Sequence, residues 1–132
     1  CVEGWEVWGR WKGILVKDLL VMAGVDPEGK YVLFGSPGNY TTSLPIPYLI
    51  KYNAILAYNV NRRPLTTTNG FPLRLIAFGK LGYKWAKTVI SLEVTGTSQT
   101  GFWEGYGYPD KADVPISRRQ YYEGKDVKPL EY

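Results

Sequence analysis

The sequence contains no histidine and only one cysteine, Cys1, among its 132 residues. The lack of histidine excludes imidazole acid–base catalysis, a Ser-His-Asp triad and histidine-ligated zinc or iron within this chain. A single cysteine excludes an internal disulfide and any metal site built from several cysteines. A metal held here would therefore need Cys1, carboxylates, or a cofactor that brings its own ligands.

Long hydrophobic runs are also missing. No stretch approaches the roughly 18 consecutive apolar residues of a membrane-spanning helix, and we expect neither a signal peptide nor an internal repeat in the given residues. The length is that of one domain with a sizeable core. We therefore expect a single domain over 1–132 without a transmembrane segment.

Hydrophobic patterning predicts more strands than helices. The apolar positions over 14–23 lie on one face of a helix, which Gly24 would end, and prolines bound a helical turn over 48–52. Strand patterns are found over 1–8, 30–34, 54–58, 73–78 and 88–94, with a weaker one over 40–44. We predict the α+β class with a mixed sheet and few short helices. Residues 97–132 are expected to form an extended arm that packs its aromatic side chains on the body.

The charge balance is modestly basic, with a formal net charge of +4 and a pI of about 9.1. This balance favours an anionic ligand but does not demand nucleic acid. Aromatic residues make up 15% of the chain, a high share that serves either a core or a binding cleft.

Two glycine-containing turns with basic residues form the most informative stretch. The first is Asn69-Gly70-Phe71-Pro72-Leu73-Arg74, and the second is Gly82-Tyr83-Lys84-Trp85-Ala86-Lys87. If the turns lie at neighbouring strand ends, a guanidinium and two ammonium groups surround glycine backbone, which makes a good phosphate receptor. The same pattern also fits an ordinary hairpin with solvated cations, and charge and glycine alone do not decide between the two.

The beginning of the chain carries a second motif, Cys1-Val2-Glu3-Gly4-Trp5, with Trp11 and Gly13 further on. Taken alone, Cys1 could be a small buried hydrophobic residue or a lipid-modified N-terminal cysteine. If the segment is extended, Glu3 shares a face with Cys1.

In this order the two motifs resemble the molybdopterin-binding domain of the sulfite oxidase family. The Cys-Val-Glu form is more similar to the protein-methionine-sulfoxide reductase branch and its small archaeal and bacterial relatives. The resemblance covers Cys1 to about Tyr108. It implies a sulfite-oxidase-type fold and an oxidoreductase that moves an oxygen atom to or from a small substrate, in a sulfoxide reductase-like or sulfite oxidase-like reaction. It also implies molybdopterin with molybdenum or tungsten, a small-molecule oxo donor or acceptor, an electron-transfer partner and an extracytoplasmic location.

The resemblance assigns roles to individual residues. Cys1 would be the metal ligand, and Glu3 would relay protons beside it. Arg74 would clamp the pterin phosphate, and Asn69 stands where sulfite oxidases carry histidine, which favours the reductase branch. The arginine that closely follows the cysteine in sulfite oxidases is replaced here by Gly4 and Trp5. The implied cofactor-binding residues are Ser36, Asn69, Arg74, Lys84, Trp85, Ala86 and Lys87.

Family members carry a segment before the cysteine that contributes part of the pterin pocket. Because the given sequence begins at Cys1, we expect this chain to present half of that pocket, with the remainder supplied by an upstream segment or a second chain.

Two non-enzymatic alternatives remain. One is a family member without the cofactor, acting as a partner domain or lipoprotein. The other is an aromatic, basic module that stacks on single-stranded nucleic acid or sugar. The enzyme hypothesis expects no nucleic-acid partner.

Overall fold

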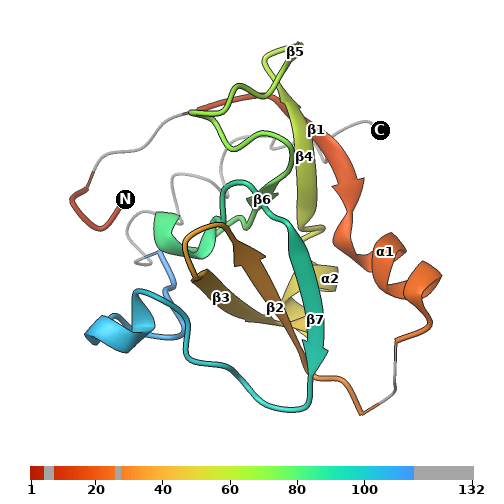
Figure 1. Ribbon diagram of the computed structural model, residues 1–132, viewed down its shortest axis with the longest axis vertical. Coiled ribbons are helices and arrows are strands. Elements are labelled where there is room, and N and C mark those ends of the chain that lie inside the picture. Colours follow the sequence, from red (N-terminus) through yellow and green to blue (C-terminus); the bar gives the residue numbers. More distant parts are fainter. Residues whose placement is uncertain (5–7, 26–27, 115–132) are drawn as a thin grey trace.

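The computed structural model describes residues 1–4, 8–25 and 28–114. Trp5 and the portion of the predicted arm beyond residue 114 lie outside the described residues. The elements are β1 (Trp11–Leu15), α1 (Val16–Ala23), β2 (Tyr31–Ser36), β3 (Tyr40–Pro45), α2 (Ile46–Lys51), β4 (Ile55–Val60), β5 (Arg63–Pro64), β6 (Arg74–Ile76), η1 (Gly82–Lys84), β7 (Ser91–Thr95) and η2 (Glu104–Tyr106) (Figure 1). This combination confirms the predicted α+β class with few short helices.

The strands divide into two antiparallel sheets. In the first, which we call sheet A, β4 is central, with β1 on one side and both β5 and β6 on the other. In the second, sheet B, β2 lies between β3 and β7. The register of sheet A pairs Ala57 with Arg74 and Val60 with both Trp11 and Arg63. Sheet A therefore links the predicted phosphate-binding arginine to the N-terminal motif.

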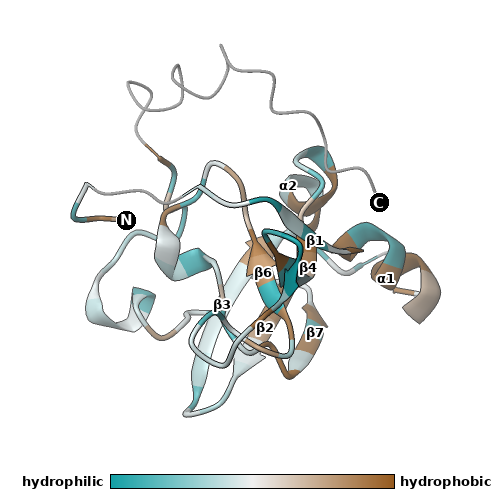
Figure 2. Cartoon of the chain, turned by 90° about the horizontal axis from the view of Figure 1, so that it is seen from above, coloured by the Kyte–Doolittle hydropathy of each residue, from teal (hydrophilic) through white to brown (hydrophobic). Residues whose placement is uncertain are grey.

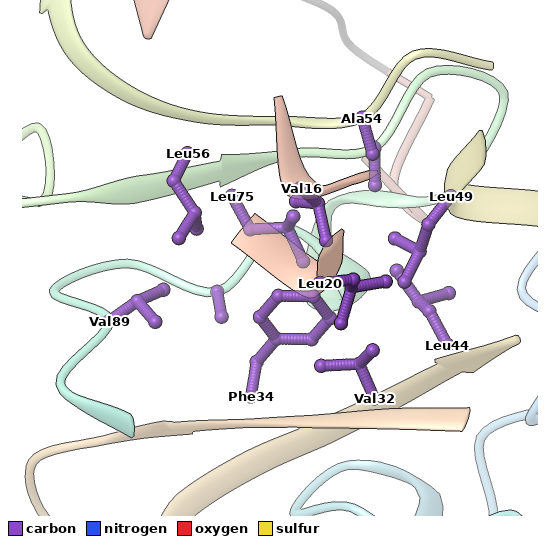
Figure 3. Packing of buried hydrophobic residues seen from close by; sticks show 12 residues of the cluster. Val16, Leu20, Val32, Phe34, Leu44, Leu49, Ala54, Leu56, Leu75 and Val89 are labelled. Atoms are coloured by element: carbon purple, nitrogen blue, oxygen red, sulfur yellow. The ribbon is translucent and has the colours of Figure 1, made fainter. Parts of the chain in front are cut away.

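The main hydrophobic core lies between the two sheets and is closed by the helices (Figure 3). Sheet B contributes Val32, Phe34 and Leu44, and all three side chains are almost fully buried. Sheet A contributes Leu56 and Leu75. Each such side chain stabilises the fold by about 1.5–3 kcal/mol relative to exposure, so the sheets hold each other in place.

A smaller apolar cluster lies on the other face of sheet A. Its buried members are Leu15, Ile55, Ala57 and Ile76, and Trp11, Phe78 and Trp85 pack against them. Successive residues of a strand point to opposite faces, so β4 sends Leu56 into the main core and its neighbours into this cluster. Trp11, near the N-terminal motif, and Trp85, in the second glycine-containing turn, thus pack against the same cluster.

Helix α1 is shorter than the pattern predicts. Ile14 and Leu15 belong to β1, where they pair with Leu56 and Ile55, because pairing with β4 outweighs their helical periodicity. The predicted stop is confirmed, since Gly24 adopts left-handed backbone (φ 62°) and its N–H bonds back into the last turn. Figure 2 shows that α1 carries both hydrophobic and hydrophilic residues along its length.

Other element boundaries also differ from prediction. The predicted strand over 1–8 is wrong for its first residues, which form a turn closed by a 3.0 Å hydrogen bond from Gly4 N–H to the Cys1 carbonyl. Strand β7 begins at Ser91 because Thr88, with φ 54°, bends the chain out of extended conformation. Helix α2 begins two residues early, at Ile46. In the described part of the chain no helix has the length and apolarity needed to span a membrane.

Candidate functional site

The two glycine-containing turns lie side by side in the structure. The turn over 66–71 is closed by hydrogen bonds of 3.0 Å from Asn69 N–H and Phe71 N–H to the Thr66 carbonyl. The second turn is attached to it because Thr88 N–H donates to the Gly70 carbonyl at 3.2 Å. Backbone hydrogen bonding therefore holds the two glycine-containing turns next to each other.

Gly70 lies between the cations of the two glycine-containing turns. A Cβ atom added there would lie 3.2 Å from the Cβ atoms of both Arg74 and Lys87. The Lys87 Nζ donates to the Thr68 carbonyl at 3.2 Å, and Arg74 Nη1 reaches the Asn69 carbonyl at 3.4 Å. Two positive charges thus flank a turn of compact backbone. We call the group formed by Asn69, Gly70, Arg74 and Lys87 the cationic cradle.

The surroundings of Arg74 suit the binding of an anion. Its guanidinium carbon lies 5.1 Å from the centre of the Trp11 ring, an arrangement that fixes the planar group by cation–π attraction. Its Nε is enclosed and has no hydrogen-bond partner, and no described carboxylate forms an ion pair with it. Burial lowers the pKa of Arg74 from its usual value, yet a guanidinium stays charged at neutral pH. Because an unpaired, half-buried charge is costly, a bound anion would stabilise this site.

Ser36 has an enclosed hydroxyl at the end of β2, on the strand to which the segment after Lys87 is hydrogen-bonded. Its Oγ is buried without a hydrogen-bond partner at the end of β2. The preceding carbonyl, of Gly35, accepts a 2.9 Å hydrogen bond from Ile90 N–H, which follows Lys87 closely in the chain. A hydroxyl in this position suits a ligand with hydrogen-bonding groups.

The Trp85 side chain and the Ala86 backbone both hold the second turn in place. Trp85 donates from Nε1 to the Lys80 carbonyl at 3.0 Å and contacts the Phe78 ring edge-on. Ala86 is buried, and its carbonyl accepts a 2.9 Å hydrogen bond from Leu75 N–H. Their predicted role as cofactor contacts stays a prediction.

Lys84 lies in the interior of the protein. Its side chain is 0% exposed, and its Nζ donates to the Ser43 carbonyl at 3.1 Å and to Asp110 Oδ1 at 2.9 Å while pairing with Glu104. The alternative of a solvated Lys84 is therefore wrong, because a buried ammonium needs such partners. Burial acts to raise the pKa of Asp110, but hydrogen bonding and attraction from Lys84 outweigh it and leave that pKa below its usual value. Sequence reasoning missed Glu104, whose only signal was a lone acid within an aromatic, glycine-rich run.

Cys1 and Glu3 lie together in the turn at the start of the chain. The Cys1 thiol donates to Glu3 Oε2 across 3.9 Å, so the acid lies beside the thiol although the segment is not extended. Figure 1 shows this turn away from β6. Among the described residues no three His, Cys, Asp or Glu side chains gather as a metal site. Cys1 would thus supply one thiolate, and a cofactor would have to supply further ligands.

Comparison with known proteins agrees with this geometry. Residues 4–103 match the family described as oxidoreductase molybdopterin binding domain. The chain is 35% identical over 108 residues to a putative protein-methionine-sulfoxide reductase subunit of Azospira oryzae, covering 82% of this chain and 41% of that protein. It is also 35% identical over 114 residues to an uncharacterized oxidoreductase of Bacillus subtilis, covering 86% and 58%. The chain therefore spans about half the length of these curated relatives.

A solved structure shows the same fold. The sulfane dehydrogenase of Paracoccus pantotrophus superposes with a TM-score of 0.64 at 29% identity, covering 68% of this chain and 23% of that one. The chain therefore belongs to the oxidoreductase molybdopterin-binding domain family, of the sulfite oxidase type that its two motifs predicted.

Proposed function

We propose that this chain is the molybdopterin-binding part of an enzyme that transfers an oxygen atom to or from a small substrate, in a sulfoxide reductase-like or sulfite oxidase-like reaction. The observation that carries the proposal is Arg74, a half-buried guanidinium stacked on Trp11, with an unpartnered Nε and no described carboxylate partner. A phosphate is the anion whose geometry best matches that fork.

Different residues of the site would bind different parts of the cofactor. Arg74 and Lys87 would bind the pterin phosphate from two sides of Gly70, where the lack of a side chain lets an anion approach the backbone. The buried hydroxyl of Ser36 and the amide of Asn69 would hydrogen-bond the pterin. When bound, the cofactor supplies dithiolene sulfurs and a metal, molybdenum or tungsten, that changes oxidation state by two electrons. Cys1 would add a soft thiolate to that metal.

Glu3 is placed to manage protons near the thiolate. Its Oε2 lies 3.9 Å from Cys1 Sγ, so the carboxylate would hold or move a proton beside the thiolate. Asn69, in place of a histidine, supports a reductase-like substrate rather than sulfite. The name of the Azospira relative supports the same direction. The substrate would be a small oxo donor or acceptor. A separate redox group would exchange electrons with the cofactor.

Metal and pterin content test the proposal directly. The natively purified protein should contain close to one molybdenum or tungsten and one pterin per chain, measured by elemental analysis and by the fluorescence of the oxidised pterin. Cys1→Ser should lose the metal. Arg74→Gln should lose pterin by tenfold or more, whereas Lys51→Ala, which removes an exposed cation elsewhere, should retain both. Absence of metal and pterin from the unmodified protein would refute the proposal.

A second candidate function comes from the aromatic residues around η2. Phe102, Trp103, Tyr106 and Tyr108 are all exposed, and their rings contact one another at 5.4–6.0 Å between centroids. Such a surface can stack on bases or sugars. If the protein carries no cofactor, quenching of Trp103 fluorescence by a single-stranded oligonucleotide or an oligosaccharide, lost in Trp103→Ala, would support this candidate.

A further inference from the structure

Four exposed basic residues, Arg10, Lys12, Arg62 and Arg63, gather at one end of sheet A. Lys12 pairs with Asn59 across β1 and β4, and Arg63 pairs with Val60 across the β4–β5 hairpin. Arg10 is fixed to the hairpin tip by two hydrogen bonds with Asn61, of 2.9 and 2.8 Å. We call these four residues the basic hairpin surface. In Figure 1 this end of the sheet, marked by β5, projects beyond β6.

No acidic side chain neutralises this surface in the part of the chain that the structure describes. The ion pairs between described residues join Lys80 to Asp113 and Lys84 to Glu104 and Asp110, and none includes a residue of this surface. The sequence has no Asp or Glu between Glu28 and Glu93, and this stretch contains the whole hairpin. Like charges held close together repel one another, so the surface is arranged to meet an anionic partner rather than to stabilise the fold.

The hairpin tip retains an arginine where the backbone favours glycine. Asn61 and Arg62 are the two central residues of a two-residue hairpin and both have positive φ, of 51° and 67°. Such turns strongly prefer Asn-Gly, because a side chain is strained in this region. Arg62 therefore places a guanidinium at the tip although the backbone there favours glycine. Strained positions of this kind are associated with functional sites.

The basic hairpin surface lies close to the cationic cradle. Arg10 and Lys12 are the sequence neighbours of Trp11, whose ring stacks with the Arg74 guanidinium. β4 extends three residues beyond Ala57, the partner of Arg74, and the hairpin tip follows directly. At about 3.3 Å per residue these three residues span roughly 10 Å. A protein bound at the tip would thus bring its own redox group near the cofactor site.

We propose that the basic hairpin surface docks an acidic face of the redox protein or domain that exchanges electrons with the cofactor. This inference rests on the proposed function. In the reducing direction the partner loses two electrons, which with two protons convert the sulfoxide oxygen to water. In the oxidising direction, water provides the oxygen atom and the same two electrons and two protons are released, the electrons to the partner. Charge complementarity selects an acidic protein surface and makes docking dependent on ionic strength.

Binding and stability measured on the same variants test the docking site. The probe is a plant-type ferredoxin, a small acidic redox protein, with basic cytochrome c as the control probe. Arg62→Gly should raise the melting temperature by about 3–5 °C, because glycine relieves the strained backbone. The same change should weaken ferredoxin binding at low salt by about three- to tenfold. Arg63→Glu should weaken it by more than tenfold, and Lys30→Gln, which removes an exposed cation near the start of β2, should leave it unchanged.

The outcomes separate this inference from the proposed function. Unchanged ferredoxin affinity in both Arg62→Gly and Arg63→Glu would overturn the docking site, whatever the metal content. Stronger, Arg62-dependent binding to phosphatidylserine vesicles or to single-stranded DNA than to ferredoxin would overturn the choice of an acidic protein. Weakened ferredoxin binding in these variants supports the docking site. If that loss occurs in a protein without metal or pterin, the docking site stands and the proposed function fails.

Discussion

Replacing Lys84 by methionine should destabilise the protein severely. Lys84 is 0% exposed and Glu104 is 5% exposed, so the ion pair is taken out of water almost completely. Methionine has nearly the length of the lysine stem and leaves little cavity, so the change removes the charge and not the packing. It leaves the Glu104 carboxylate buried, with the Thr42 hydroxyl donating to its Oε1 at 3.0 Å.

The size of the destabilisation depends on which of the two acidic partners of Lys84 is buried. Breaking a buried ion pair by removing one member costs about 3–5 kcal/mol, because the other charge stays uncompensated. Asp110, which is 54% exposed in its side chain, loses only a screened interaction worth about 0–1 kcal/mol. For a domain with about 5–15 kcal/mol of total stability, Lys84→Met thus removes a fifth or more of it.

Urea unfolding of a double-mutant cycle measures this coupling. Lys84→Met alone should lose about 3–5 kcal/mol, and Lys84→Met with Glu104→Gln should recover most of that loss, since no buried charge remains. Asp110→Asn is the matched control and should cost less than about 1 kcal/mol. The reasoning fails if Lys84→Met costs under about 1 kcal/mol, or if the double variant is no more stable than the single one.

Three further predictions concern backbone and titration. Gly70→Ala should cost about 1–2 kcal/mol and reduce pterin retention, because φ is +104° and the new Cβ meets Lys87 at 3.2 Å; unchanged stability and pterin content would contradict this. Gly13→Ala should abolish or severely weaken folding, judged by circular dichroism, because its Cβ would lie 2.2 Å from the Leu56 carbonyl oxygen. Burial, reinforced by the charge of Glu104, raises the pKa of Tyr40 to about 12. Because the folded pKa is raised, the stabilisation is complete below pH 10 and is lost between pH 10 and 12. Tyr40→Phe should remove a phenolate absorbance transition near pH 12, and a transition near pH 10 would be the contrary result.

Local patterns in the sequence predicted the elements whose cause is local. Gly24 ends α1 because its left-handed backbone suits glycine, and the apolar run of β4 is buried on both faces. The boundary between β1 and α1 was placed wrongly, since pairing of Ile14 and Leu15 with β4 is a contact distant in sequence. The start of β7 was missed for a similar reason, because the bend at Thr88 carries no residue signal.

The sequence by itself determined which chemistries are possible and which motifs matter. Without histidine and with one cysteine, a metal would need Cys1, carboxylates or a cofactor that brings its own ligands, and the residue types of the two glycine-containing turns fitted either a phosphate receptor or a hairpin with solvated cations. The tertiary structure decided how the cations of these turns are used. Arg74 and Lys87 flank Gly70, whereas Lys84 turns inward to Glu104. The physical reason is that a cation's role depends on its neighbours and its exposure to water, and both are set by segments far apart in the chain.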